Sequence, residues 1–237
     1  MPSYAGRTVG QWFDLYTDNG GNNSPAQITN VAPAFTAMGT NAVPYLVGRI
    51  TQPDHSAFTR WRYRNRQRIP KLVEGLLPSL PRSRFTEGMN AAELLTVHIQ
   101  PSRALLLPLL EPALHSTNLD QRVAAFAALR SKTPDFALAQ PHLTRGLKDA
   151  NRDVQKFAAL AIRRQGADGQ WALTNLLEAS RSADPETLAY LLYALNNLGT
   201  NAVRALPELR RMLGAETNAE RRVFIANSIH SISNSVP

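Results

Sequence analysis

Apolar residues recur along most of this 237-residue chain at the three- and four-residue spacings of amphipathic helices. The first such face is formed by Val9, Trp12, Phe13 and Tyr16, and it predicts an opening helix over residues 4–16. From residue 25 onward the periodic segments come in twos, separated by short breaks that carry Gly, Asn or Pro. The pattern therefore predicts an all-α chain built from helix pairs.

Within each predicted pair the first helix is named A and the second B. The first predicted pair has an A helix whose apolar residues run from Ile28 to Met38 and a B helix that runs to about Ile50. The later predicted helices are 91–99 with 104–114, 120–130 with 136–147, 153–164 with 170–179, 185–198 with 201–213, and an unpaired last helix, 219–232. The first apolar positions of the last four A helices are separated by 31, 34 and 35 residues; they are Val123, Val154, Leu188 and Val223. This is the length of two short helices plus two turns, which indicates tandem repeats.

A five-residue junction supports the repeat, because residues 39–43 (Gly-Thr-Asn-Ala-Val) recur as residues 199–203. The glycine suits the left-handed residue that closes helix A. Thr40 or Asn41 is expected to cap helix B, and Pro44 fits its first turn. In the second pair, Gln100 occupies the position that matches the glycine.

Two prolines give a further expectation about the B helices. Pro108 and Pro207 each lie eight residues after the junction position, at Gln100 and Gly199. Because proline breaks a continuous helix, helix B of these pairs is expected to begin near each proline, after one irregular turn.

The repeats imply one domain over residues 1–237. Its predicted parts are an N-terminal cap helix and turn (1–24), an inserted basic and Pro-rich connection (52–90), and a C-terminal capping helix (217–237). The Ala-rich A helices at 123–129 and 154–162, together with the Gly-x-x-Ala-Val junction, resemble HEAT repeats.

The opening Tyr4-Ala5-Gly6-Arg7, with Trp12, is similar to the segment before the repeats in a group of uncharacterised bacterial HEAT-repeat proteins. The resemblance implies an α-α superhelix, a right-handed solenoid of about five helix pairs plus a terminal helix, whose B helices line the concave side. Members of that group often carry an N-terminal export signal or anchor.

Composition limits the chemistry that the chain can carry and the classes of protein that it fits. The formal net charge is +8 and the sequence pI is about 10.3, which makes this a basic protein. Cysteine is absent, which excludes disulfides, cysteine-ligated zinc, iron–sulfur clusters and a thiol nucleophile. No apolar stretch approaches the ~18 residues of a membrane span, and residues 1–15 lack the pattern of a signal peptide. The chain as written is expected to be soluble and cytoplasmic, or extracytoplasmic if an export signal or anchor precedes Met1.

The sequence offers no motif for catalysis or for a cofactor. None of the five histidines lies four residues from another, and H-E-x-x-H, G-x-S-x-G and Walker-type phosphate loops are all absent. A metal site would need side chains from different repeats to meet. We therefore expect a protein that is not an enzyme and that has no catalytic, cofactor-binding or metal residues recognisable from spacing.

A basic segment within the insertion is the candidate partner-binding site. It interleaves cations with aromatic rings, which is typical of nucleic-acid contact by charge and stacking. Its residues are Arg60, Trp61, Arg62, Tyr63, Arg64, Arg66, Arg68 and Lys71. The same composition fits an acidic protein or peptide partner, or a segment that is solvated or paired within the chain, with aromatic rings anchoring it to the solenoid.

Three functions are compatible with these features. The leading hypothesis is a non-enzymatic scaffold that binds another protein or peptide on the concave face of the solenoid. The alternative is a nucleic-acid-binding protein with a fold like that of HEAT-like DNA glycosylases, although no Trp is followed four residues later by Asp as their catalytic pocket would require. A lyase-like or chaperone-like repeat protein is a third reading. Self-association is also possible, because the apolar end faces of solenoids tend to pair.

Overall fold

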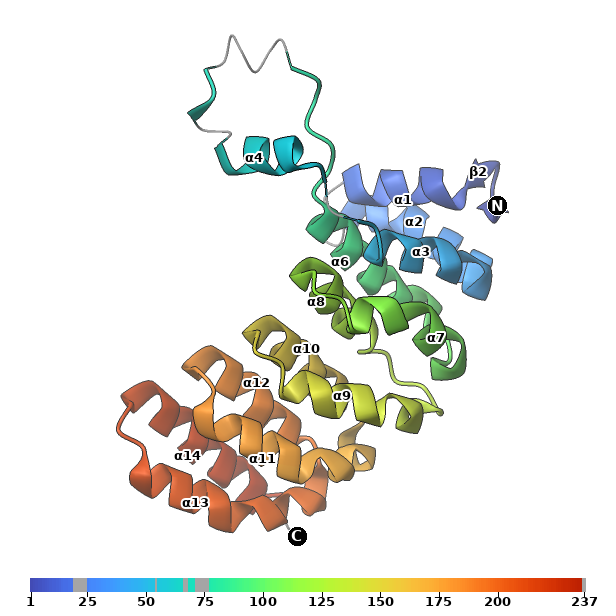
Figure 1. Cartoon of the computed structure of the whole chain (residues 1–237). Helices are drawn as coiled ribbons and strands as arrows, with labels where there is room; N and C mark the ends of the chain where they lie inside the picture. The colour runs from blue at the N-terminus through green and yellow to red at the C-terminus, as the bar shows by residue number, and fades with distance from the viewer. Residues whose placement is uncertain (19–24, 54, 66–67, 71–76, 236–237) are drawn as a thin grey trace.

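Two rows of helices run side by side along a curved stack, with the chain termini at opposite ends (Figure 1). This computed structural model describes residues 1–18, 25–53, 55–65, 68–70 and 77–235, and gives the backbone alone for residues 25–30, 57, 60, 63 and 64. The arrangement is an all-α superhelix, as the periodicity predicted.

The A helices form one row and the B helices form the other. The A row is α2 (Pro25–Met38), α6 (Arg84–Leu94), α8 (Leu119–Ala128), α10 (Arg152–Arg163), α12 (Pro185–Asn196) and α14 (Ala219–Ser233). The B row is α3 (Val43–Ile50), α7 (Arg103–Leu114), α9 (Gln140–Leu147), α11 (Leu173–Ser182) and α13 (Leu206–Ala215). The described residues thus hold five A/B pairs and the terminal α14, in agreement with the predicted number.

Short irregular turns connect the helices of each pair. Four 3₁₀ segments lead into B helices: η2 (Gly39–Ala42), η5 (Phe136–Ala139), η6 (Gly166–Ala172) and η7 (Gly199–Ala205). A π-type turn, η4 (Leu95–Ile99), extends α6. Each A helix from α6 to α14 contacts the next A helix, and their small side chains, such as Ala125 and Ala158, are fully buried at these contacts.

The true register of the repeat is set by polar N-caps. The side chains of Asn118, Asn151, Asp184 and Asn218 accept backbone N–H bonds at the starts of α8, α10, α12 and α14. These caps are 33, 33 and 34 residues apart. The predicted register was wrong, since Val223, taken as a core position, is 57% exposed while Ile225 is fully buried.

The junction glycines behave as predicted, but the predicted cap does not form. Gly39 and Gly199 have φ of +52° and +63°, and Gln100, at the matching position, has φ of +48°. No side-chain cap bond starts α3, and Thr40 and Asn41 are exposed. The reason is that the 3₁₀ turn satisfies the backbone itself, with the N–H of Val43 donating to the carbonyl of Thr40.

One of the two proline predictions is confirmed. Pro207 lies in the first turn of α13. Pro108 does not start a helix, because α7 begins at Arg103 behind the cap Ser102 and contains Pro108 within it. Both Pro108 and Ala104, whose carbonyl loses its partner to the proline, are exposed, so water can satisfy that carbonyl.

The N-terminus also differs from the prediction of a helix over residues 4–16. A short antiparallel hairpin, β1 (Ser3–Tyr4) and β2 (Arg7–Thr8), comes first, and α1 (Val9–Asp18) follows it. Ala5 and Gly6 take positive φ in the turn. The indole N–H of Trp12 donates to the carbonyl of Tyr4 at 3.0 Å, which holds the hairpin on α1.

The second pair starts earlier than the sequence indicated. Helix α6 begins at Arg84, seven residues before the predicted start at Ala91. Its first turns look polar in sequence, but Glu87 is buried and its carboxylate is 2.9 Å from Arg84 and 3.8 Å from Arg49. Because the ion pairs allow a charged residue to lie inside the stack, the spacing of apolar residues in the sequence does not reveal this face of the helix.

Candidate functional site

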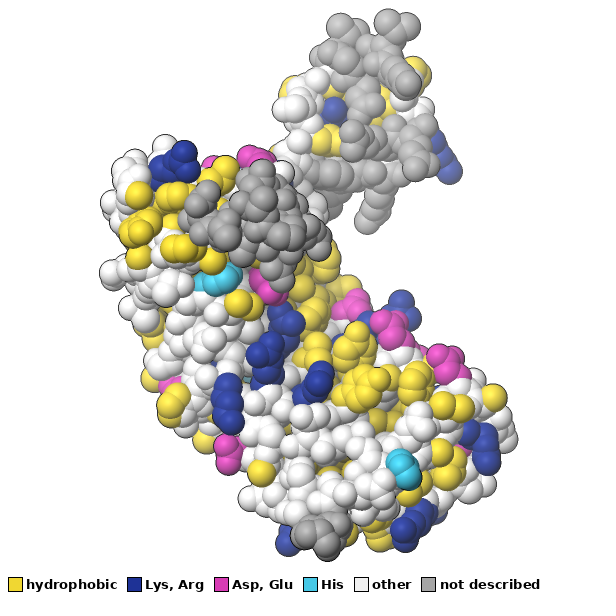
Figure 2. Space-filling model, turned by 180° about the vertical axis from the view of Figure 1, so that it is seen from behind, with side chains coloured by type: hydrophobic (Ala, Val, Ile, Leu, Met, Phe, Trp, Pro, Cys, Tyr) yellow, Lys and Arg dark blue, Asp and Glu magenta, His cyan; other side chains and the backbone are white. Residues whose placement is uncertain are grey.

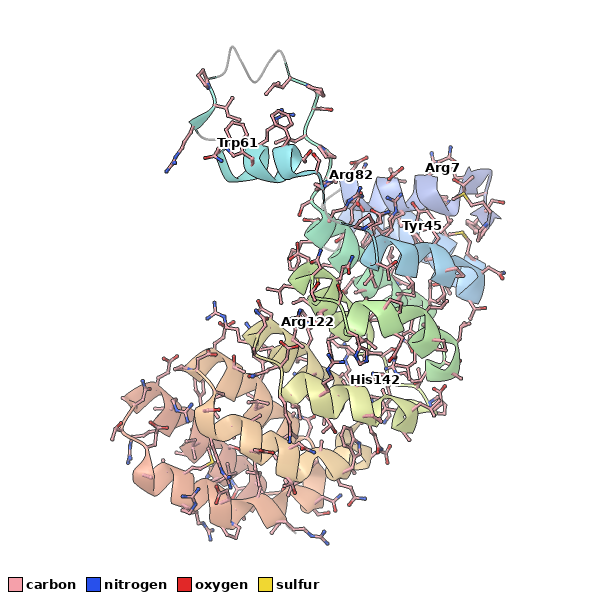
Figure 3. All side chains as sticks on the ribbon, viewed as in Figure 1. Arg7, Tyr45, Trp61, Arg82, Arg122 and His142 are labelled. Carbon is pink, nitrogen blue, oxygen red and sulfur yellow. The ribbon has the colours of Figure 1, made fainter. Side chains whose placement is uncertain are left out.

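The predicted basic segment forms part of an arm that stands away from the helix stack. Its helix is α4 (Ala57–Asn65), and Trp61 lies on it, far from the two rows (Figures 1 and 3). The side chains of Phe58 and Trp61 are 55% and 52% exposed and stack with ring centroids 6.1 Å apart.

Arg62 has an intramolecular role instead of an exposed one. It is only 5% exposed, and its Nη1 donates to the carbonyl of Pro78 at 2.8 Å, which ties α4 to the returning chain. Arg68 is exposed. For Arg60, Tyr63 and Arg64 only the backbone is described, and Arg66 and Lys71 lie outside the described residues. Partner binding by this segment therefore stays a prediction.

A second basic surface lies at the carboxyl ends of α8, α10 and α12. A hollow of about 390 Å³ is lined by Arg130, Leu160, Arg163, Arg164 and Asn197, and is called the basic hollow below. Arg130 and Arg163 each come twelve residues after an N-cap, so they occupy the same position in successive repeats. Figure 2 shows Lys and Arg side chains gathered midway along the face opposite the view of Figure 1.

Arg130 is held in place by neighbouring side chains and by a backbone carbonyl. The Nη2 of Arg130 is 3.3 Å from a carboxylate oxygen of Glu93 on α6. Its Nε donates to the carbonyl of Ala127, and its guanidinium carbon is 5.3 Å from the ring centroid of Phe157 on α10. Arg130 thus bridges three A helices and gives the hollow one fixed wall.

The other two arginines are exposed. The guanidinium carbon of Arg163 is 5.8 Å from the ring centroid of Tyr193 on α12. Among the described residues, no carboxylate comes within 4.0 Å of Arg163 or Arg164. Their positive charges also interact favourably with the negative C-terminal end of α10. This interaction does not use their N–H donors, which can bind a ligand. Guanidinium donors match carboxylate or phosphate oxygens, two bonds at a time.

Two other pairs of adjacent arginines, Arg210–Arg211 and Arg221–Arg222, do not extend the basic hollow into a continuous basic surface. Arg221 is bonded to Glu216, at 2.6 Å, and Arg222 donates to the carbonyl of Leu213 at 3.0 Å. They close the turn between α13 and α14. Arg211 pairs with Glu208 at 2.7 Å, and this pairing lowers the pKa of the Glu208 carboxyl to about 2.

Arg163 and Arg164 are adjacent in the sequence, but the sequence does not place Arg130 beside them. The two sites are 33 residues apart, and the helix caps with the same spacing are the signal that aligns them. One further cluster of side chains, Glu111 with His115 and His142, joins two repeats on the B row and could ligate a metal ion.

Comparisons with known proteins support the fold. No protein-family model matches the chain, and no curated protein matches it. Among solved structures, computationally designed armadillo repeat proteins for modular peptide recognition are similar over 94% of this chain and 91% of theirs, with 16% identity and a TM-score of 0.53. A designed armadillo repeat protein in complex with the peptide (KR)4 is similar over 95% and 100%, with 15% identity and a TM-score of 0.53.

A third solved structure, an engineered protein, is similar over 96% of this chain and 97% of its own, at 17% identity and a TM-score of 0.52. At such identities the likeness concerns the fold alone. The class of protein is therefore a helical-repeat solenoid. Among the helices of the described residues, none has the length and apolar character needed to cross a membrane.

Proposed function

We propose that this chain is a non-catalytic, HEAT-type interaction scaffold that binds an acidic segment of another protein in the basic hollow. The observation that carries the proposal is the presence of Arg163 and Arg164 beside Arg130 in one hollow, with two of the three guanidiniums lacking a described carboxylate partner. Because Arg130 and Arg163 occupy the same position in successive repeats, the hollow suits a ligand chain that runs across the repeats.

The solenoid architecture is compatible with this use. The designed armadillo proteins of similar fold were made for modular peptide recognition, and one of them holds a basic peptide. This chain carries a net charge of +8, so charge complementarity favours an acidic ligand. Two helices per repeat, where armadillo repeats have three, support the HEAT-type assignment.

An acidic peptide fits the hollow better than a nucleic acid does. Binding of single strands relies on aromatic faces that are free to stack on bases. Here the described residues that line the hollow include no aromatic side chain. The hollow therefore offers charge without free aromatic platforms.

The test is fluorescence anisotropy with a labelled octapeptide of alternating Glu and Ala. We expect salt-dependent binding by the intact chain and an affinity at least about tenfold weaker for the double variant Arg163→Glu/Arg164→Glu. The matched control is Arg210→Glu/Arg211→Glu, which makes the same change in charge on exposed residues of α13 and is expected to bind as the parent chain does to within about threefold.

Two results would contradict the proposal. One is equal binding by both double variants, which would mean that only net charge matters. The other is tighter binding of a duplex DNA than of the peptide, lost in the Arg163→Glu/Arg164→Glu variant, which would make the hollow a nucleic-acid interface. Far-UV circular dichroism of each variant verifies that the helices remain intact.

A further inference from the structure

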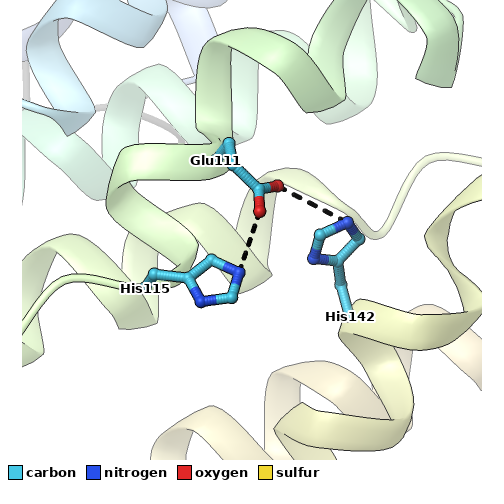
Figure 4. Close-up of side chains that lie close together, drawn as sticks. All are labelled: Glu111, His115 and His142. Atoms are coloured by element: carbon cyan, nitrogen blue, oxygen red, sulfur yellow. Dashed lines mark ion pairs between the residues drawn. The ribbon is translucent and has the colours of Figure 1, made fainter.

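Three side chains with metal-ligating atoms meet between two repeats on the B row. Glu111 lies near the end of α7, His115 follows that helix, and His142 is in the first turn of α9 (Figure 4). The Nε2 atom of His115 is 3.0 Å from one carboxylate oxygen of Glu111, and the Nε2 atom of His142 is 3.6 Å from the other. One ligand atom from each residue lies within 4.8 Å of the others.

The donor set is one that zinc uses. Two imidazoles and one carboxylate, with a fourth position left to water, form a common three-ligand zinc site. Zinc–ligand distances of about 2.0–2.2 Å place tetrahedral ligand atoms ~3.3 Å apart. The separations of 3.0 and 3.6 Å lie on either side of this value, each to a different oxygen of Glu111, and rotation of the exposed Glu111 and His115 side chains can bring one oxygen to both imidazoles.

Arg145, on α9 like His142, places a positive charge beside this cluster. A guanidinium Nη1 of the exposed Arg145 contacts the ring nitrogens of His115. Arg145 thus competes with a metal ion for the same imidazole and adds an opposing charge.

We propose that Glu111, His115 and His142 form a binding site for Zn²⁺ that links α7 to α9, with Arg145 weakening it. This site is independent of the basic hollow, which lies at the ends of the A helices. Competing sites are few, because the chain has no cysteine and five histidines. Among the other three, His55 is bonded to the carbonyl of Arg82 and His230 to Asn234.

The experiment is titration of the full chain, with any purification tag removed, with ZnCl₂ against a chromophoric zinc chelator. We expect one Zn²⁺ per chain, and at least about tenfold weaker binding for His115→Ala and for His142→Ala. His230→Ala is the matched control and should bind as the parent does. Zinc should also raise the melting temperature of the parent chain and leave that of His142→Ala unchanged.

Arg145→Gln gives the test that a nonspecific site cannot pass. Because this variant removes the competing donor and a positive charge, zinc affinity should rise several-fold, whereas loss of a merely structural contact would lower it or leave it unchanged. The proposal is overturned if the parent chain binds no zinc at micromolar concentration. It is also overturned if His115→Ala and His142→Ala bind as well as His230→Ala, or if Arg145→Gln binds more weakly than the parent.

Discussion

Gly146 allows a B helix to pack closely against two A helices, and Gly146→Ala tests that packing. The residue lies in the last turn of α9, between α8 and α10. A Cβ atom added there would lie 2.9 Å from the Cβ of Ala158 and closer still to the ring of Phe126. Phe126 is 2% exposed and Ala158 is fully buried, so neither can move without disturbing the core.

The magnitude follows from two opposing effects. In a helix, alanine is favoured over glycine by up to ~1 kcal/mol. Inserting a methyl group into a filled core costs about 1–3 kcal/mol, and the overlap with both neighbours places this site at the upper end. We therefore expect Gly146→Ala to lower the free energy of unfolding by roughly 2 kcal/mol.

The matched control is Gly48→Ala in the last turn of α3. That glycine is exposed, and an added Cβ would meet nothing within 4 Å. The control should be neutral or more stable by up to about 1 kcal/mol. Urea unfolding followed by circular dichroism measures both variants, and equal stability of Gly146→Ala and Gly48→Ala would refute the packing argument.

Two further predictions concern buried charge and junction geometry. Arg103 is fully buried and donates to the carbonyls of Leu129 and Ser131, both at 2.6 Å, although burial lowers its pKa to about 10. Because Arg103→Met orphans two buried carbonyls, it should destabilise the chain by about 2–4 kcal/mol in urea unfolding; a variant as stable as the parent would contradict this. At the junctions, Gly199→Ala should lower the free energy of unfolding by about 1 kcal/mol, and Gln100→Gly should raise it by a similar amount, because both positions have φ near +50° to +60°. Thermal unfolding measures both variants, and changes of the opposite sign would contradict this explanation.

Much of the architecture was accessible from the sequence because it depends on local rules. The 3.6-residue period located the helix pairs, and the junction glycine identified the left-handed residue between helices A and B. The register was available too, in a signal that apolar positions do not carry. An Asn or Asp followed two residues later by an acidic residue recurs at 118, 151, 184 and 218, and it marks the four caps.

The sites were harder to predict because they depend on contacts between repeats. Glu111 and His115 are one helical turn apart, but His142 is 27 residues beyond His115, and only the placement of α9 beside α7 brings it to Glu111. The start of α6 was hidden for a related reason, since Glu87 reads as a surface residue until Arg49, from the preceding pair, is placed beside it. Long-range pairing of charged groups leaves no periodic trace in a sequence.

The repeat separates positions that maintain the stack from positions that can vary. Seven residues after each cap the side chain is fully buried and apolar, and these residues are Ala125, Ala158, Leu191 and Ile225. Twelve residues after each cap the side chain is polar, and these residues are Arg130, Arg163, Asn196 and His230. A substitution at the first position would disturb contacts with two neighbouring A helices, whereas one at the second changes the chemistry at the end of one helix. The basic hollow therefore arises where two successive repeats both place arginine at the variable position. The next repeat has Asn196 at that position, and the amide of the neighbouring Asn197 lines the hollow there.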